Sequence, residues 1–243
     1  YAQIQYMIND FFSLTLGGGL NDYLISSEFN DTSTINLGYK KLELNNLSII
    51  KNFSLNYAKS KLVINFKLFD GFRNPNVDDM TKVFSKDDKN VVVPNNNLRP
   101  EKVSNYEIAT TYKTNKFELS LNSYLSLINN AISREFSQIN NQDSILYDGE
   151  IMRVQMNKNI DNITIYGFEI FTKSLFANNY TMDNKVIFTA GLKSNNDPLA
   201  HIAPIQIKNN FKKKIGNSYI ALSHTFYGKK DNEDFDLGGI DNL

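Results

Sequence analysis

Cysteine and tryptophan are absent from the 243 residues of this chain, and proline occurs only five times. Without cysteine the chain has no disulfide bond, no thiolate metal site and no cysteine nucleophile. Only two histidines are present, and neither lies near other ligand types at metal-binding spacing, so we expect no metal site and no resident cofactor. Lys and Arg number 26, as do Asp and Glu, so no excess positive charge favours nucleic acid.

Motifs of common enzymes and ion sites are also missing. Gly17-Gly18-Gly19 has no Lys-Ser/Thr partner and no following helix, so it is not a phosphate-binding loop. No Gly-x-Ser-x-Gly elbow occurs. The acidic stretches Asp78-Asp79 and Lys86-Asp87-Asp88-Lys89 lack the spacing of a calcium loop. The sequence therefore predicts a protein that is not an enzyme.

No stretch of about 18 apolar residues is present, so we expect no membrane-spanning helix. A membrane-spanning strand needs only about 9–11 residues, half of them apolar. Apolar residues do recur with period two along most of the chain, as in Leu62, Ile64, Phe66 and Leu68. Helical spacing is hardly present. The pattern predicts an all-β chain whose strands each have one apolar and one polar face.

The alternation predicts about ten antiparallel strands, near residues 1–8, 11–24, 49–58, 61–72, 103–113, 116–130, 150–176, 180–194, 202–213 and 216–229. Short turns alternate with longer loops, which we expect at 25–48, 73–102, 131–149 and 195–201, with another beginning at Lys230. Short turns on one side and long loops on the other are typical of a transmembrane β-barrel, whereas a β-sandwich mixes its loop lengths.

Both ends of the chain resemble cuts. The sequence opens at Tyr1 within a strand pattern and closes at Leu243 in a Gly/Asp-rich stretch. We therefore expect residues 1–243 to be one partial β-barrel domain of a longer protein. Its sheet should be open at both edges.

Two motifs flank the longest predicted loop. The first is Gly71-Phe72-Arg73-Asn74-Pro75-Asn76-Val77-Asp78-Asp79, and the second is Pro94-Asn95-Asn96-Asn97-Leu98-Arg99-Pro100-Glu101. In this order and spacing they resemble two boxes of TonB-dependent outer-membrane receptors, with Asn74 replacing the usual Ala and Asn96 the inner Pro. The segments 157–169 and 198–211 are similar to two later strands of the same family.

The resemblance implies a segment of a plugged barrel of about 22 strands in the bacterial outer membrane. It implies partners as well: the lipid bilayer, and the TonB complex, reached through a plug outside this chain. The cargo would be an iron chelate, a siderophore or haem. Haem receptors of this type carry a histidine between the two motifs, and this chain has none there. A cobalamin or a glycan remains an alternative cargo, and a secreted glycan-binding β-sandwich an alternative class.

Five residues are candidates for ligand binding: Arg73, Phe84, Phe136, Tyr147 and His201. Arg73 ends a strand before a proline turn, so we expect it to anchor the following loop by pairing with Glu101 or Asp78. The others lie in predicted long loops, where aromatic residues interleave with polar ones. Haem would need His201 or Tyr147 as an axial ligand.

Overall fold

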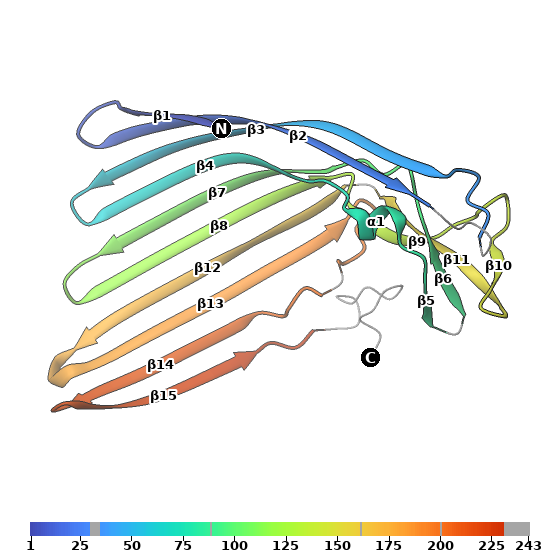
Figure 1. The fold of residues 1–243 in the computed structure, drawn as a ribbon. Coiled ribbons are helices and arrows are strands. Elements are labelled where there is room, and N and C mark those ends of the chain that lie inside the picture. Colours follow the sequence, from blue (N-terminus) through green and yellow to red (C-terminus); the bar gives the residue numbers. More distant parts are fainter. Residues whose placement is uncertain (30–34, 88, 161, 200, 231–243) are drawn as a thin grey trace.

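Ten long strands form one continuous antiparallel sheet, which we call the wall sheet (Figure 1). A computed structural model describes residues 1–29, 35–87, 89–160, 162–199 and 201–230. The strands of the wall sheet, in spatial order, are β1 (Ala2–Met7), β2 (Phe12–Glu28), β3 (Lys41–Lys59), β4 (Leu62–Arg73), β7 (Glu101–Lys113), β8 (Phe117–Asn129), β12 (Ile163–Phe176), β13 (Tyr180–Lys193), β14 (Gln206–Ile215) and β15 (Ser218–Tyr227). β1 and β15 are its open edges, as predicted.

The strand register sorts the side chains of the wall sheet onto two faces. One cross-strand row is apolar throughout and consists of Leu16, Phe53, Leu68, Tyr106, Leu125 and Tyr166. The neighbouring row on the other face is mainly polar and consists of Thr15, Ser54, Lys67, Glu107 and Tyr124. Large apolar residues such as Leu119, Leu121 and Leu125 are exposed, at 37–39%. A β-sandwich would bury these residues beneath a second sheet, whereas here they are exposed.

Short turns close one end of the wall sheet, as the sequence predicted. Ser60, Asn179 and Gly216 adopt left-handed backbone conformations in three of them, which short polar residues and glycine tolerate. The turn at 177–179 is a single 3-10 turn, η1 (Ala177–Asn179). In the described part of the chain, no helix has the length and apolar character needed to cross a membrane.

A second, five-stranded sheet lies at the opposite end, and we call it the rim sheet (Figure 1). It contains β5 (Phe84–Asp87), β6 (Asn90–Val93), β9 (Ile132–Phe136), β10 (Ser144–Tyr147) and β11 (Glu150–Asn159). The only helix of more than one turn's length among the described residues, α1 (Val77–Thr81), also lies at this end. The regions predicted as loops at 73–102 and 131–149 therefore each contain two short strands of the rim sheet, which corrects the sequence analysis.

The rim sheet has an apolar core of its own. One buried cluster unites Ile35, Leu37, Val91, Val93, Ile139, Met152 and Val154. These residues come from three of the four predicted long loops and from β11. Because each loop alone is too short to bury an apolar face, the three loops gain stability by packing together. The prediction that the loops gather on one rim is thus confirmed for these three.

The single strand predicted at 150–176 was wrong. The segment breaks after Asn159, and β12 begins at Ile163 in the other sheet. The partner strand also breaks, between β8 and β9, where Asn130 has a left-handed backbone. Pairing nevertheless keeps one register across the break, since Ile128 faces Ile163 and Ile132 faces Asn159. On the β8–β9 side the bend falls at Asn130, and neither Gly nor Pro marks it.

Strands β2 and β3 are longer than predicted. β2 runs to Glu28 and β3 starts at Lys41, so half of the expected loop at 25–48 is paired strand. Ile25 and Leu42 pack on the polar-face side against Met80 of α1 and against Leu98. This second cluster fixes α1 against the extended hairpin. The predicted loop beginning at Lys230 lies, beyond that residue, outside the described residues.

Candidate functional site

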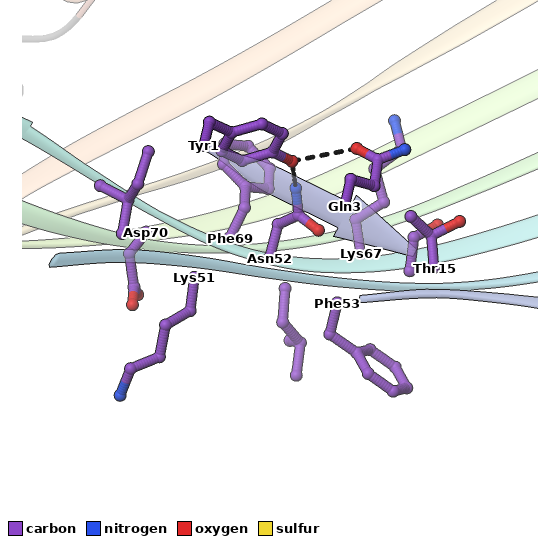
Figure 2. A pocket seen from close by; sticks show the side chains of 12 residues that line it. Tyr1, Gln3, Thr15, Lys51, Asn52, Phe53, Lys67, Phe69 and Asp70 are labelled. Atoms are coloured by element: carbon purple, nitrogen blue, oxygen red, sulfur yellow. Dashed lines mark hydrogen bonds between the residues drawn. The ribbon is translucent and has the colours of Figure 1, made fainter. Parts of the chain in front are cut away.

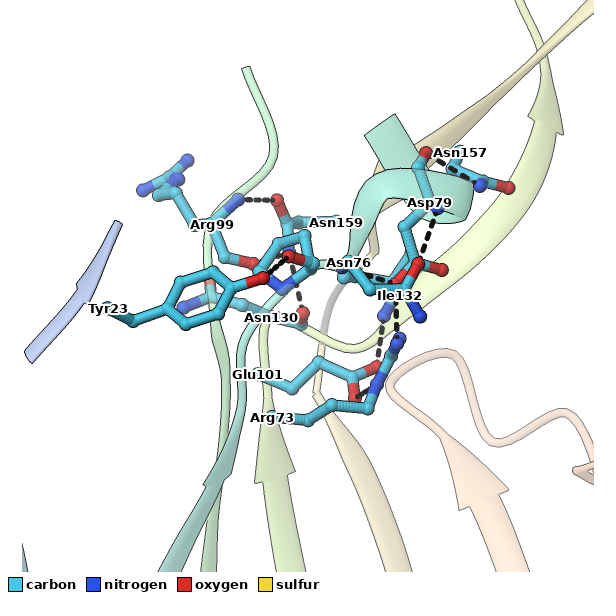
Figure 3. Close-up of polar contacts among 11 residues, drawn as sticks. Tyr23, Arg73, Asn76, Asp79, Arg99, Glu101, Asn130, Ile132, Asn157 and Asn159 are labelled. Atoms are coloured by element: carbon cyan, nitrogen blue, oxygen red, sulfur yellow. Dashed lines mark hydrogen bonds and ion pairs between the residues drawn. The ribbon is translucent and has the colours of Figure 1, made fainter. Parts of the chain in front are cut away.

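Arg73 lies at the centre of an ionic cluster where the wall sheet meets α1 (Figure 3). Its Nε donates to Glu101 Oε2 at 2.5 Å, and its Nη1 donates to Asp79 Oδ2 at 2.7 Å. The other oxygen of Glu101 accepts the backbone N–H of Ile132 at 2.6 Å. These charge-assisted bonds join β4, α1, β7 and β9 at one point. The expected pairing with Glu101 is confirmed.

Asp79, not Asp78, is the second partner of Arg73. Asn76 and Asp79 form a capping box, in which the Asn76 side chain accepts the Asp79 N–H and the Asp79 carboxylate accepts the Asn76 N–H. This geometry turns Asp79 back toward Arg73. Asp78 instead faces Lys82 at 4.0 Å. The expectation for Asp78 was therefore wrong.

Asparagine side chains hold the segment after Arg73 in place (Figure 3). Asn157 Nδ2 donates to the carbonyl of Asp79 at 2.9 Å, and Asn95 Nδ2 donates to the carbonyl of Asn157 at 2.6 Å. Asn159 Oδ1 accepts the backbone N–H of Arg99 at 2.7 Å. Because these side chains satisfy backbone groups of an irregular segment, they fix its path between the two sheets.

Replacing Arg73 with Ala should loosen α1 while the barrel wall stays folded. The Arg73 side chain is 46% exposed, so solvent screens its ion pairs, and we expect a cost of about 1 kcal/mol. Hydrogen-exchange protection of residues 77–81 should fall about fivefold. The pattern that would contradict this is unchanged protection in residues 77–81 together with lost ligand binding, since it would make Arg73 a ligand contact.

Two arginine–phenylalanine pairs lie on the face of the rim sheet opposite its core. The Arg153 guanidinium stacks on the Phe136 ring at 3.9 Å, and that of Arg134 lies 5.1 Å from the Phe84 ring centre. Lys82 Nζ also lies 5.4 Å from the Phe84 ring. Both phenylalanines were predicted site residues, and the fold brings them into one cluster. We call Phe84, Arg134, Phe136 and Arg153 the Arg–Phe cluster.

The Arg–Phe cluster spans one cross-strand row. Phe84 faces Val92, Val92 faces Gln155, and Gln155 faces Phe136, so the row crosses β5, β6, β11 and β9. Val92 is 2% exposed, although it lies on this outer face. Gln155 Oε1 is buried and has no hydrogen-bond partner among the described residues. The row therefore carries two aromatic side chains and one unused acceptor, and the two arginines flank it, Arg134 opposite Asn157 and Arg153 opposite Asn90.

Such a surface is chemically suited to a flat, anionic ligand. Guanidinium groups present planar, forked donors to carboxylate, catecholate or phosphate oxygens. Aromatic faces add stacking area and hold each guanidinium in a defined plane. The sequence analysis missed Arg134 and Arg153, because nothing local in the sequence connects β5 with β9.

The other two predicted site residues, Tyr147 and His201, lie elsewhere. Tyr147 is on β10, where it packs against the core cluster of the rim sheet. His201 lies between β13 and β14 with a left-handed backbone, φ 62°. Tyr39 packs edge-on against Phe29, with ring centres 5.9 Å apart, and burial raises the pKa of its phenol. Tyr39 therefore stays neutral at physiological pH and contributes packing rather than charge.

A cavity of about 390 Å³ lies at the open edge strand β1 (Figure 2). The Tyr1 hydroxyl donates to Gln3 Oε1 at 3.0 Å and accepts from Asn52 Nδ2. Lys51 and Asp70 point to the opposite side of the sheet. No group of three or more His, Cys, Asp or Glu residues is arranged for metal binding within the described residues.

Comparisons with known proteins identify a family and solved structures that are similar to this chain. Residues 1–240 match the family described as "TonB dependent receptor-like, beta-barrel". A search of curated proteins found no match. Among solved structures, the copper transporter OprC has a TM-score of 0.71 at 13% identity, covering 90% of this chain and 33% of that one.

Two further solved structures show the same fold. The siderophore receptor PirA from Pseudomonas aeruginosa gives a TM-score of 0.70 at 12% identity, with coverage of 93% and 38%. The Serratia marcescens hemophore receptor HasR, bound to hemophore and heme, gives 0.70 at 10% identity, with coverage of 93% and 43%. The chain thus spans less than half the length of each of these solved structures.

Proposed function

Because this chain belongs to the TonB-dependent receptor β-barrel family, whose members lie in the bacterial outer membrane, we propose that it forms part of a receptor that imports an iron chelate. In this proposal the extracellular rim sheet captures the chelate, and the TonB complex supplies energy through a plug domain outside residues 1–243. The polar face of the wall sheet lines the lumen, and its apolar face contacts lipid. Proteins of this family are transporters rather than enzymes.

The Arg–Phe cluster is the observation that carries the choice of cargo. Siderophore-type chelates present flat, anionic iron-binding groups, for which two stacked guanidinium groups are suitable partners. An uncharged glycan would leave both arginines without an anionic partner. Cobalamin is larger and has little exposed negative charge. The cluster therefore supports an anionic chelate over these two alternatives.

Haem is the second candidate, since it is flat and carries two carboxylates. The Arg–Phe cluster would suit its propionates as well. Its iron would need His201 or Tyr147 as an axial ligand. Tyr147 packs against the rim core, and His201 lies on a different connection, between β13 and β14. Neither residue belongs to the Arg–Phe cluster, so we favour the iron chelate over haem as the cargo.

Replacing Arg134 and Arg153 together with Gln should weaken chelate binding by the complete receptor at least about tenfold, since each charged hydrogen bond contributes roughly 1.5–3 kcal/mol. A panel of ferric catecholate, ferric hydroxamate and haemin, measured by fluorescence quenching, provides the probes. Lys89→Gln is the control, because Lys89 is exposed and lies beside β6 outside the cluster.

Unchanged binding of every ferric chelate by the double variant would rule out the cluster as the capture surface. Haemin is followed separately through its Soret absorbance. A Soret shift that disappears when His201 and Tyr147 are both replaced would make haem the cargo. A receptor that takes up none of the panel would reject both candidates.

A further inference from the structure

A row of polar side chains interrupts the apolar face of the wall sheet across β13, β14 and β15. The register pairs Asn184 with Asn209 and Asn209 with His224, so these three residues lie side by side on one face. That face is the apolar one, because Val186, two residues beyond Asn184, shares a cross-strand row with Leu121. We call Asn184, Asn209 and His224 the Asn–His row.

The Asn–His row lies inside the apolar face rather than at its end. The nearest residues of the same face on each strand, two positions before and after the row, are all apolar. They are Met182 and Val186 on β13, Ile207 and Phe211 on β14, and Leu222 and Phe226 on β15. Under the proposed assignment of this face to lipid, acyl chains therefore surround the row, and they offer no hydrogen-bond partner.

Most hydrogen-bonding groups of the Asn–His row are unused within the described part of the chain. Asn184 Nδ2 donates to Thr172 Oγ1 at 3.0 Å. The side chains of Asn209 and His224 form no hydrogen bond with the described residues. Because polar groups left unpaired in hydrocarbon are costly, the row indicates a binding partner on the outside of the wall sheet.

The chemistry of the Asn–His row points to a copy of the same surface as that partner. The row contains no carboxylate or ammonium group, so it does not select a charged partner. Each asparagine, like a neutral histidine, carries both a donor and an acceptor, so the row can pair with an identical row. Its apolar neighbours, such as Phe211 and Leu222, can likewise pack against their own copies. A two-fold axis brings one surface patch against itself in this way.

We propose that a second copy of the receptor packs against the Asn–His row within the membrane. The two-fold axis runs along the membrane normal beside Asn209, where the amide of each copy donates to the amide oxygen of the other. Ile207 and Phe211 of both copies pack around this polar centre. The inference rests on the proposed assignment of the apolar face to lipid but not on the cargo, so failed chelate binding leaves it standing.

Crosslinking of the complete receptor in outer membranes tests the contact. Phe211→Cys supplies the reporter, since residues 1–243 contain no cysteine and any cysteine outside them is replaced with serine. A short bismaleimide should link two copies. Adding Asn209→Leu and His224→Leu should lower the linked fraction about fivefold, because polar contacts between membrane segments contribute modestly but measurably. Adding Asn209→Gln instead keeps the amide and should preserve the linking.

Phe66→Cys is the matched control for the reporter. Phe66 is 37% exposed on the same face and Phe211 is 41% exposed, but Phe66 lies on β4, far along the sheet from β14. It should link few copies. Equal labelling of the two cysteines by a monofunctional maleimide verifies their access, and heat-modifiable migration verifies folding. A leucine variant that fails this check is replaced by Asn209→Ala, His224→Ala, which should show the same loss.

Four results would overturn the proposal. They are no dimer from the labelled Phe211→Cys receptor, an equal dimer fraction from Phe66→Cys, an unchanged dimer fraction after Asn209 and His224 are replaced, and linking only to a protein of different mass. The second would identify random encounters of crowded receptors. The last would assign the Asn–His row to a different protein.

Discussion

Substituting Asp for Val154 should abolish ligand capture while leaving the barrel wall folded. Val154 is 0% exposed and lies in the core of the rim sheet beside Val91 and Met152. An unpaired carboxylate buried there lowers the stability of the rim sheet by more than about 3 kcal/mol. This exceeds the stability that we expect of five short strands. The strands of the rim sheet should therefore separate. If the rim sheet must refold for the chelate to bind, the affinity for the chelate should fall at least about a hundredfold. Hydrogen exchange should show lost protection in β6 and β11.

Ile151→Asp is the matched control for this experiment. Ile151 lies on the same strand but is 79% exposed, so its carboxylate remains hydrated. Protection of β6 and β11 should stay close to that of the parent. If Val154→Asp also removed the heat-modifiable band of the complete receptor, the rim and wall would be one cooperative unit, contrary to this prediction.

Introducing Ala at Gly167 should prevent assembly of the wall itself. A Cβ at this position would overlap the backbone carbonyl of Phe188 on the neighbouring strand, and would lie 2.7 Å from the Tyr124 hydroxyl. That hydroxyl is already bonded to Thr189 at 2.7 Å, which limits its freedom to move. Overpacking of this kind costs about 1–3 kcal/mol or more, and here it also separates paired strands.

Folded yield in outer-membrane extracts, read from heat-modifiable migration, measures the effect of Gly167→Ala. We expect a severalfold loss of the folded band. Gly18→Ala provides the comparison, because its Cβ would meet only the Ile50 carbonyl at an ordinary 3.6 Å. Similar yields for the two variants would show that the wall sheet adjusts to the added methyl group, and the argument for Gly167 would fail.

The wall sheet was predictable because its signal is local. Alternation along each strand sets which face a residue occupies, and short turns set which strands pair. Phe66 and Leu68 therefore share the apolar face, as the alternation predicts. The Arg73–Glu101 pair was also predictable, since the two residues end adjacent strands opposite each other.

The rim sheet was not predicted, because its strands are short and pair across long separations. β6 and β11 run parallel, with Val91 facing Arg153's neighbour Val154. The run Val91-Val92-Val93 contains a signal for β6. A short apolar run without alternation indicates a strand buried on both faces. Likewise, the Asn76-x-x-Asp79 spacing is a capping box, and it would have selected Asp79 over Asp78.

The parallel pairing of β6 with β11 also implies an order of folding. Val91 and Val154 are about sixty residues apart, and the hairpins of β7, β8 and β9 lie between them. Closing so long a loop early would cost chain entropy with few contacts in return. Formation of the β7–β8 and β8–β12 pairs brings the two segments together first. The wall sheet should therefore fold before the rim sheet. The three valines of β6 then stay exposed until the rim sheet forms in the last step of folding.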